Sequence, residues 1–181
     1  MVHILADILT LIQYKNEVED GFKEKYRPER CEHCGKRKVW CHGSYPRQAA
    51  GRRNQSDSVL NPLKIQRYYC ASCCRTMSVL PECLPPHRWY LWSVQQAALL
   101  LVLSGTSIYK VAQISAASRH TLARWMSRFK EQLLVHRDAL GCIKSSLSRT
   151  AGFYSFWGSC LKLMSLSEAM RLCHVSGVVV P

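Results

Sequence analysis

The chain has 181 residues, of which 48% are hydrophobic, and this length suits one ordinary domain or two small ones with a tail. Its formal net charge is +13. Residues 35–130 contain 15 Lys and Arg but only two acidic residues, Asp57 and Glu82, so this segment accounts for the whole excess of positive charge. A basic segment of this kind suits a polyanionic partner, and a solvated basic face is the alternative.

The composition also bears on where the protein works. Residues 1–14 do not have the basic region, apolar stretch and small-residue cleavage site of a signal peptide. The longest apolar run, residues 97–103, is far shorter than the about 20 residues that span a bilayer. We therefore expect a soluble, cytoplasmic protein with no membrane partner. In such a reducing compartment, clustered cysteines indicate metal or redox chemistry rather than disulfides.

Residues 1–27 are expected to form an N-terminal helix, because apolar residues between positions 4 and 24 follow a rough helical stripe that ends before Pro28. Residues 28–81 have a different texture, with paired cysteines, short β-rich runs and a polar basic loop. One of these runs alternates, and residues 76–80 are expected to form a further strand. In the alternating run, one side carries Leu63, Ile65 and Tyr69, and the other carries Lys64, Gln66 and Tyr68.

Two CxxC pairs stand at the ends of this β-rich segment, with 35 residues between them. Four thiolates at these spacings can surround one tetrahedral zinc ion, because each pair supplies two ligands from one tight turn. Gly35 suits such a turn, since the residue after the second cysteine often needs a conformation that costs glycine little. We predict a zinc ribbon over residues 28–81 with one structural Zn²⁺. Its ligands are Cys31, Cys34, Cys70 and Cys73. Four thiolates leave no position for a water, so the ion has no catalytic role.

Alternatives to this site stay open. A redox CxxC motif would stand at the start of a helix in a βαβ pattern, which neither pair does, and the cysteines could also be inert. Cys74 stands where the first pair has Gly35, and it could compete as a ligand. His33, Cys41 and His42 are expected to be packing or strand residues, because four cysteines already complete the site.

Prolines at positions 81, 85 and 86 indicate a stiff linker over residues 82–88, and residues 89–136 have a helical pattern. A lead-in helix is expected over residues 90–103. It is followed by a short helix from its N-cap Ser107 to Gln113, a turn over residues 114–117, and a second helix capped by Ser118.

The apolar residues of the two later helices fall on one face. Val111 and Ala112 point inward from the first. In the second, apolar residues recur at i, i+3, i+4, i+7 and i+11, namely Leu122, Trp125, Met126, Phe129 and Leu133. This is typical of a helix-turn-helix, whose second helix enters the DNA major groove through its N-terminal residues; ordinary amphipathic helices with basic polar faces are the alternative. The predicted DNA-binding residues are Ser118, Arg119, His120, Ala123, Arg124, Arg128, Lys130, Arg47, Arg52 and Arg53.

Residues 137–181 are expected to form a Ser-rich C-terminal tail that is partly helical, with one further helix near residues 161–173. Its aromatic cluster is expected in the core or at the contact of a homodimer, rather than stacked on nucleic acid. The cluster consists of Phe153, Tyr154, Phe156 and Trp157. The last valines, residues 178–180, could form an end that never packs.

Four pieces of the sequence resemble the N-terminal part of bacterial insertion-element transposases and their small relatives. They read CEHCGK, VWCHGSYPR, IQRYYC and ASCCRTMSVLP. In that family a ribbon of the form CxxCG…HGxYxR…RYxCxxCxRTFSxLP precedes a helix-turn-helix, and the resemblance covers about residues 28–135. It implies the same four cysteines as zinc ligands, and recognition of element-end DNA by the helix-turn-helix. The sequence departs from the pattern at Cys74 and at Met77, where an aromatic is usual, and neither change removes a ligand.

Full-length transposases of this kind continue into a ribonuclease H-like domain in which three carboxylates hold two metal ions. Here only Glu131, Asp138 and Glu168 follow the helical pair, in about 45 residues, too few for that fold. We therefore expect a DNA-binding protein of a bacterial mobile element without nuclease activity, either an accessory product or a truncated transposase.

The sequence as a whole predicts an α+β protein, with a small β zinc ribbon followed by a mainly α helix-turn-helix domain and flanking helices. Double-stranded DNA is the expected partner, and a homodimer stays open. Two other functions fit the same parts: a host transcriptional regulator, and a zinc-dependent protein-interaction module whose basic surface meets an acidic partner.

Overall fold

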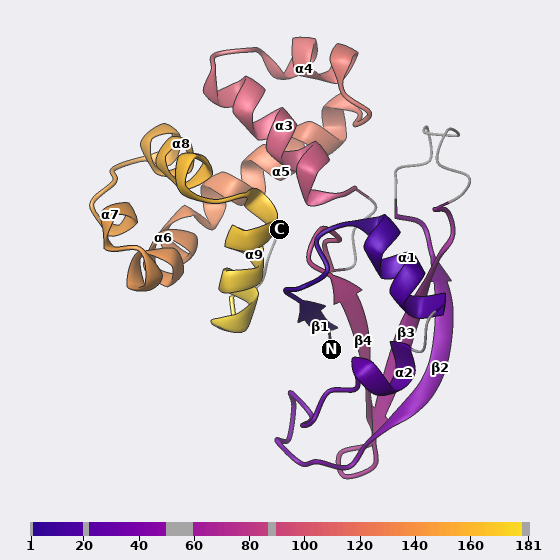
Figure 1. The fold of residues 1–181 in the computed structure, drawn as a ribbon. Coiled ribbons are helices and arrows are strands. Elements are labelled where there is room, and N and C mark those ends of the chain that lie inside the picture. The colour runs from indigo at the N-terminus through magenta and orange to yellow at the C-terminus, as the bar shows by residue number, and fades with distance from the viewer. Residues whose placement is uncertain (1, 20–21, 50–59, 87–89, 179–181) are drawn as a thin grey trace. The chain divides into compact units, whose positions relative to one another are not determined.

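The computed structural model describes residues 2–19, 22–49, 60–86 and 90–178. It has the α+β composition that the sequence predicts, with a mixed sheet and a set of helices (Figure 1). The chain divides into two compact units, Met1–Trp89 and Tyr90–Pro181. Unit 1 holds the sheet and unit 2 is helical.

The sheet of unit 1 has the strand order β1-β4-β3-β2 in the described part of the chain. β1 (Val2–Leu5) pairs in parallel with β4 (Arg75–Pro81), whereas β3 (Leu63–Cys70) pairs antiparallel with both β4 and β2 (Val39–Arg47). The strand expected over residues 76–80 is confirmed as β4. β2 is the edge strand beside β3, so its outer edge carries no further strand among the described residues.

The expectation of one N-terminal helix over residues 1–27 is wrong. Its first residues form β1, and two short helices follow, α1 (Leu11–Glu19) and α2 (Phe22–Lys25). A reciprocal cap starts α1 at this point: the Gln13 amide donates to Thr10 Oγ1 (3.1 Å), and the Thr10 amide donates to Gln13 Oε1 (3.0 Å). Before that cap, Val2 and Leu5 are buried, and their strand pairs with β4. The apolar pattern of these residues fits a helix as well as a strand, so it did not reveal the pairing.

Burial on β3 does not follow the alternation of the sequence. Leu63 and Ile65 are buried as expected, but Gln66 and Tyr68, on the opposite side, are buried too. The helices cover that side of the sheet: the Tyr68 hydroxyl donates to the Lys23 carbonyl (2.9 Å), and the Tyr14 hydroxyl donates to the Val79 carbonyl (2.8 Å). Both faces of β3 are therefore partly covered, and a simple two-residue period fails.

Unit 2 begins with α3 (Trp92–Leu103), α4 (Ile108–Ile114) and α5 (Arg119–Glu131), close to the limits that the sequence predicts. Four more helices follow: α6 (Leu133–Ile143), α7 (Ser145–Ser148), α8 (Phe153–Leu163) and α9 (Leu166–Val175). Ser107 and Ser118 cap α4 and α5 as predicted, accepting hydrogen bonds from the amides of Lys110 and Thr121.

Residues 137–181 are not a separate tail. Phe156 and Trp157 of α8 are fully buried in the same hydrophobic core as Leu99 of α3 and Phe129 of α5. The Trp157 ring packs edge-on against the Phe129 ring, with centroids 5.0 Å apart. Residues 178–180 could have formed an end that never packs, but Val178 contacts this core; Val179 and Val180 lie outside the described residues. Core burial, one of the two expectations for the aromatic cluster, is thus confirmed for Phe156 and Trp157, whereas Tyr154 is exposed.

The buried polar side chains of unit 2 include Gln95 of α3 and His136 of α6. His136 of α6 is fully buried beside Trp157 (ring centroids 5.5 Å), and neither ring nitrogen has a hydrogen-bond partner in the part of the chain that the structure describes. Burial lowers the pKa of His136 to about 4, because the charged ring would lose its water without gaining a partner.

We expect this histidine to make unit 2 sensitive to acid. Its pKa falls on folding, so only the unfolded chain gains this proton as the pH drops from about 6.5 towards 4, and stability is lost over that window. The wild type should be about 2 kcal/mol less stable at pH 5 than at pH 7 through this group. His136→Phe should reduce that difference, whereas His120→Phe on the exposed surface of α5 should not. Urea unfolding at both pH values, followed by helical circular dichroism, measures this; equal pH dependence in the wild type and His136→Phe would contradict it.

Candidate functional site

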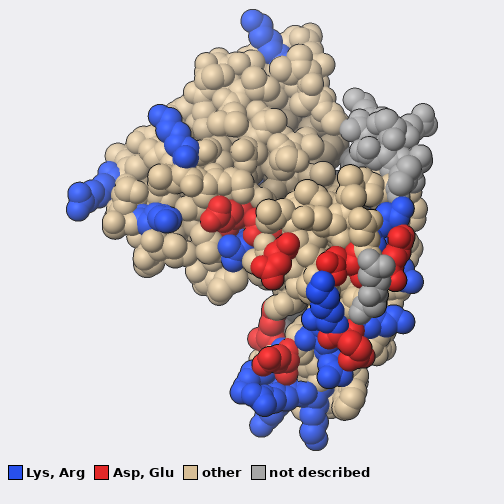
Figure 2. All heavy atoms as spheres, viewed as in Figure 1, with Lys and Arg blue, Asp and Glu red and all other residues tan. Residues whose placement is uncertain are grey.

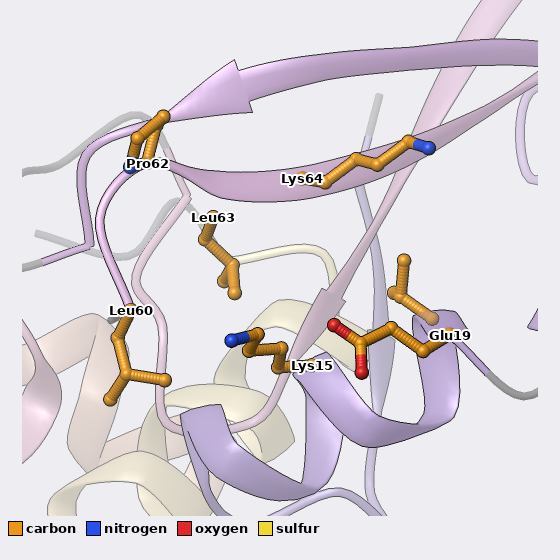
Figure 3. A pocket seen from close by; sticks show the side chains of 7 residues that line it. Lys15, Glu19, Leu60, Pro62, Leu63 and Lys64 are labelled. Atoms are coloured by element: carbon orange, nitrogen blue, oxygen red, sulfur yellow. The ribbon is translucent and has the colours of Figure 1, made fainter. Parts of the chain in front are cut away.

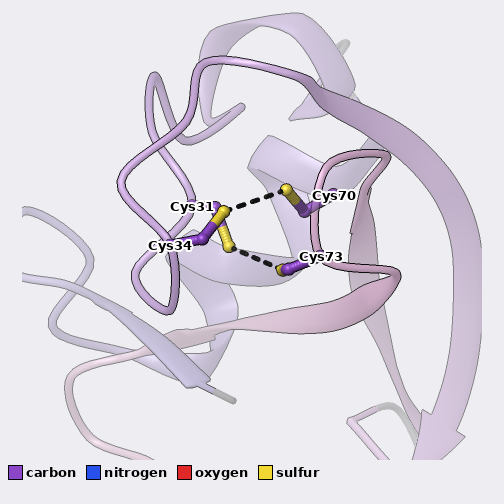
Figure 4. Close-up of side chains that lie close together, drawn as sticks. All are labelled: Cys31, Cys34, Cys70 and Cys73. Carbon is purple, nitrogen blue, oxygen red and sulfur yellow. Dashed lines mark hydrogen bonds between the residues drawn. The ribbon is translucent and has the colours of Figure 1, made fainter.

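The four predicted cysteine ligands lie together at one end of the sheet. Cys31 and Cys34 lie in the loop before β2, Cys70 ends β3, and Cys73 lies in the turn that leads into β4 (Figure 4). Their Sγ atoms all lie within 4.8 Å of one another. Two sulfur pairs, Cys31 with Cys73 and Cys34 with Cys70, lie 3.6 Å apart, and each joins one CxxC to the other. This cluster could hold a metal ion.

Two matching turns present these sulfurs; we name residues 31–36 the first knuckle and residues 70–75 the second. The Gly35 amide donates to the Cys31 carbonyl (2.8 Å), and the Cys74 amide donates to the Cys70 carbonyl (2.9 Å). Gly35 and Cys74 both have positive φ, +68° and +55°. Cys74 therefore occupies the left-handed position that glycine fills in the first knuckle, and its side chain is exposed and lies outside the sulfur cluster.

The charge state of the cluster follows from its geometry. Burial raises the pKa of Cys70, but hydrogen bonds from the backbone amides of Cys73 and Ser72 act in the opposite direction. The net result is a pKa lowered to about 6. Burial raises the pKa of Cys73 to about 12, and its contact with Cys31 acts in the same direction. The protein alone thus favours one thiolate and retains protons on its neighbours, because adjacent negative charges repel. A cation that displaces those protons would stabilise all four thiolates together.

The sulfur set suits a four-coordinate metal. A tetrahedral set of four thiolates is the usual environment of zinc or iron, and it leaves no open position for water or substrate. Three neighbouring side chains predicted as non-ligands lie outside the cluster, as expected: His33, Cys41 and His42. Cys41 accepts a hydrogen bond from Gln66 Nε2 (3.2 Å), and the His42 ring lies against the Tyr69 ring.

The predicted DNA-binding residues of unit 2 share one surface of α5. Ser118, Arg119 and His120 are exposed at its N-terminal end, and Ala123 and Arg124 are exposed one turn later. Lys130 is exposed near the C-terminal end, where its ammonium lies over the Phe153 ring, and Arg128 is half-buried. The opposite side of α5 is buried in the core through Leu122, Trp125, Met126 and Phe129.

The predicted basic residues of unit 1 have a different setting. Arg47 ends β2 and is half-buried, its guanidinium donates to the Pro85 carbonyl, and burial lowers its pKa. This guanidinium therefore has a partner within the protein, whereas the sequence predicts it as a DNA contact. Arg52 and Arg53 lie outside the described residues.

Two features of unit 1 were missed in the sequence. One is a surface cavity of about 420 Å³ (Figure 3), lined by Lys15, Val18, Glu19, Leu60, Pro62, Leu63 and Lys64. No motif marks it, since its residues are scattered between α1 and the start of β3. The other is a set of aromatic rings on β2 and β3 that includes Trp40, which is 58% exposed. The strand pattern of the residues around Trp40 was the signal in the sequence that could have indicated this set.

A protein-family profile described as a domain of unknown function (DUF6431) matches residues 31–125, which is just over half of the chain and includes both knuckles, α4 and the first half of α5. No curated protein and no solved structure matches the chain significantly. Among the described residues, no helix is both long and apolar enough to cross a membrane.

The knuckle geometry predicts opposite roles for two adjacent cysteines. Cys73→Ser should lose bound metal because it removes one of the four clustered sulfurs. Cys74→Gly should keep the metal and raise the free energy of unfolding by about 1 kcal/mol, because it relieves a left-handed non-glycine residue. Elemental mass spectrometry of the purified chain gives the metal content, and chemical unfolding gives the stability.

Gly35→Ala is the matched control in the first knuckle. A Cβ there would meet no atom within 4 Å, so its expected cost, about 1 kcal/mol, is purely conformational. Loss of metal from Cys74→Gly with retention in Cys73→Ser would overturn the assignment of ligands.

Proposed function

The chain belongs to the DUF6431 family, and we propose that it is a zinc-stabilised protein that binds double-stranded DNA through a helix-turn-helix formed by α4 and α5. The observation that carries this proposal is the division of α5 into a buried apolar side and an exposed basic side at its N-terminal end. The proposal concerns binding and assigns no catalytic residue.

Zinc is the ion that we propose for the sulfur cluster. A tetrahedral ion with Zn–S bonds of about 2.3 Å needs sulfurs roughly 3.8 Å apart. Two sulfur pairs lie at 3.6 Å, so a small adjustment would accommodate the ion. Its role is structural: it would join the first knuckle to the β3–β4 turn and thereby stabilise the small sheet of unit 1.

The packing around α4 and α5 supports a fixed helix-turn-helix. Tyr90, at the start of unit 2, contacts both the turn and α5. Its hydroxyl donates to the Ala116 carbonyl in the turn (3.3 Å), and its ring packs edge-on against Trp125 of α5, with ring centroids 5.2 Å apart. Val111 of α4 and Leu122 of α5 are buried in the same core. A rigid pair of helices can present the N-terminal residues of α5 to a major groove in one orientation.

The electrostatics of this surface favour a polyanion. No Asp or Glu occurs between Glu82 and Glu131, a stretch that includes all of α3 and α4 and all but the last residue of α5. Among the described residues, neither Arg119 nor Arg124 has an acidic partner. Their guanidinium groups are therefore available to donate two parallel hydrogen bonds to a guanine edge or to contact phosphates.

The resemblance to insertion-element transposases leads us to propose that the bound DNA belongs to a mobile element. A host regulator of the same architecture would use the same surface, so the identity of the selected DNA separates these two functions. A protein-interaction module would instead show no preference among duplex sequences.

We expect Arg119→Ala and Arg124→Ala to weaken binding to a duplex selected from a random pool by about 1–3 kcal/mol each, because a bidentate contact to a base is lost. Binding to unselected duplex should change much less, since most non-specific affinity comes from phosphate contacts. Fluorescence anisotropy at two salt concentrations measures both affinities.

Arg149→Ala is the control for charge, because Arg149 is an exposed arginine of unit 2 that lies outside α5. It should affect selected and unselected duplexes alike. An equal loss on both duplexes for Arg119→Ala and Arg124→Ala would contradict base recognition by α5.

A further inference from the structure

Three aromatic rings form a strip on the sheet of unit 1, next to the knuckles; we name Trp40, His42 and Tyr69 the aromatic strip. Trp40 and His42 are exposed, and Tyr69 is half-buried. Trp40 of β2 stands directly opposite Tyr69 of β3 in the antiparallel register, so the two side chains share one face of the sheet. The His42 ring lies against the Tyr69 ring, with centroids 5.5 Å apart and a tilt of 33° between planes.

A β-bulge sets the position of His42 in the strip. The β2–β3 register shifts between Cys41 and Ser44, where β2 has an extra residue. Gly43 at the bulge has a φ of +83°, and its carbonyl accepts a hydrogen bond from Gln66 Nε2 (2.6 Å). Gln66 is only 2% exposed, so the side chain that makes this hydrogen bond is buried. His42 and Gly43 together therefore stand opposite Arg67, the residue two positions before Tyr69 on β3.

The strip is not part of the core of unit 1. α2 covers the opposite face of β3, where the Tyr68 hydroxyl donates to the Lys23 carbonyl. On the strip's own face, Leu63 and Ile65 are buried further along β3, so the exposed part of this face lies at the knuckle end. On the strip's own face, Trp40 is 58% exposed, and Thr76, which pairs with Tyr69, is exposed as well. A large aromatic side chain left in water beside others contributes little to folding, and grouped exposure of this kind indicates a binding surface.

Exposed basic side chains stand next to the strip's strands in the chain. Lys36, Arg37 and Lys38 are exposed immediately before β2, and Arg75 is exposed at the start of β4. Figure 2 shows Lys and Arg gathered at the knuckle end of unit 1, with some acidic residues beside them. The acidic residue of the first knuckle, Glu32, is paired with His3 (2.7 Å). A ligand of this surface must therefore combine negative charge with flat apolar faces.

We propose that the aromatic strip binds single-stranded DNA, with bases stacked on Trp40 and on the His42–Tyr69 pair while the basic knuckle residues contact the phosphates. Unpaired bases offer open ring faces, and stacking on aromatic side chains is tolerant of sequence. Bases within a duplex already stack on one another, so a duplex offers no faces to such a strip. The strip belongs to unit 1, and this inference holds whether or not α5 binds a duplex.

The test uses the full-length, metal-containing chain and fluorescently labelled oligothymidylate of about 20 nucleotides, with a duplex of the same length as comparison. The wild type should bind oligothymidylate, and Trp40→Ala should weaken that binding roughly tenfold or more while leaving duplex binding within about twofold. Trp40 is exposed, so its removal should not unfold the sheet. Tyr154→Ala, which removes an aromatic ring that is 59% exposed on α8, is the matched control and should change neither affinity.

The remaining outcomes each decide the question. Three results would overturn the proposal. The first is an equal loss of oligothymidylate affinity in Trp40→Ala and Tyr154→Ala, and the second is an equal loss of affinity for oligothymidylate and duplex in Trp40→Ala. The third is that the wild type does not bind oligothymidylate. Clear preference for oligouridylate would overturn the choice of DNA, and binding of acidic polypeptide in place of either would mark a protein-interaction surface. Arg119→Ala and Arg124→Ala should leave oligothymidylate binding unchanged, so failure of the duplex function can be recognised separately.

Discussion

The sulfur cluster is the constraint on which unit 1 depends. Four thiol groups with Sγ atoms within 4.8 Å of one another cannot all ionise without a cation. The two knuckles that carry these thiols also define how the strands of the sheet meet. The second knuckle sets the β3–β4 turn, and Cys70 pairs with both Val39 of β2 and Arg75 of β4. Because the register of β2 on β3 starts at this point, the same cluster determines where Trp40 stands opposite Tyr69. We infer that a metal ion held by this cluster would stabilise the module and also align its exposed surface.

Unit 2 is stabilised differently, by a hydrophobic core that includes residues from α3 to α9. As a result, the apolar side of α5 is buried in the core, whereas the basic side at its N-terminal end is exposed to solvent. The contribution of α8 and α9 explains how so short a helical pair as α4 and α5 can be rigid, since Phe129 packs on Trp157. This core also buries the imidazole of His136, which has no hydrogen-bond partner among the described residues.

Local signals were sufficient where chemistry acts over a few residues. The CxxC spacing predicted the sulfur cluster, and the serines at positions 107 and 118 predicted the starts of α4 and α5, because a cap or a turn is a local arrangement. Predictions that depend on distant partners failed. Residues 2–5 form a strand only because β4 is there to pair with them, and Tyr68 is buried only because α1 and α2 cover it. The bulge at Gly43 likewise depends on Gln66, which stands on a different strand.

The central claim is that α5 recognises duplex DNA with its N-terminal residues, and backbone nuclear magnetic resonance of the full-length chain tests it most directly. On addition of a duplex selected from a random pool, we predict that the largest chemical-shift changes fall on residues 118–124, with smaller changes along the rest of the exposed side of α5. Changes that avoid residues 118–124, while the duplex is demonstrably bound, would contradict the account.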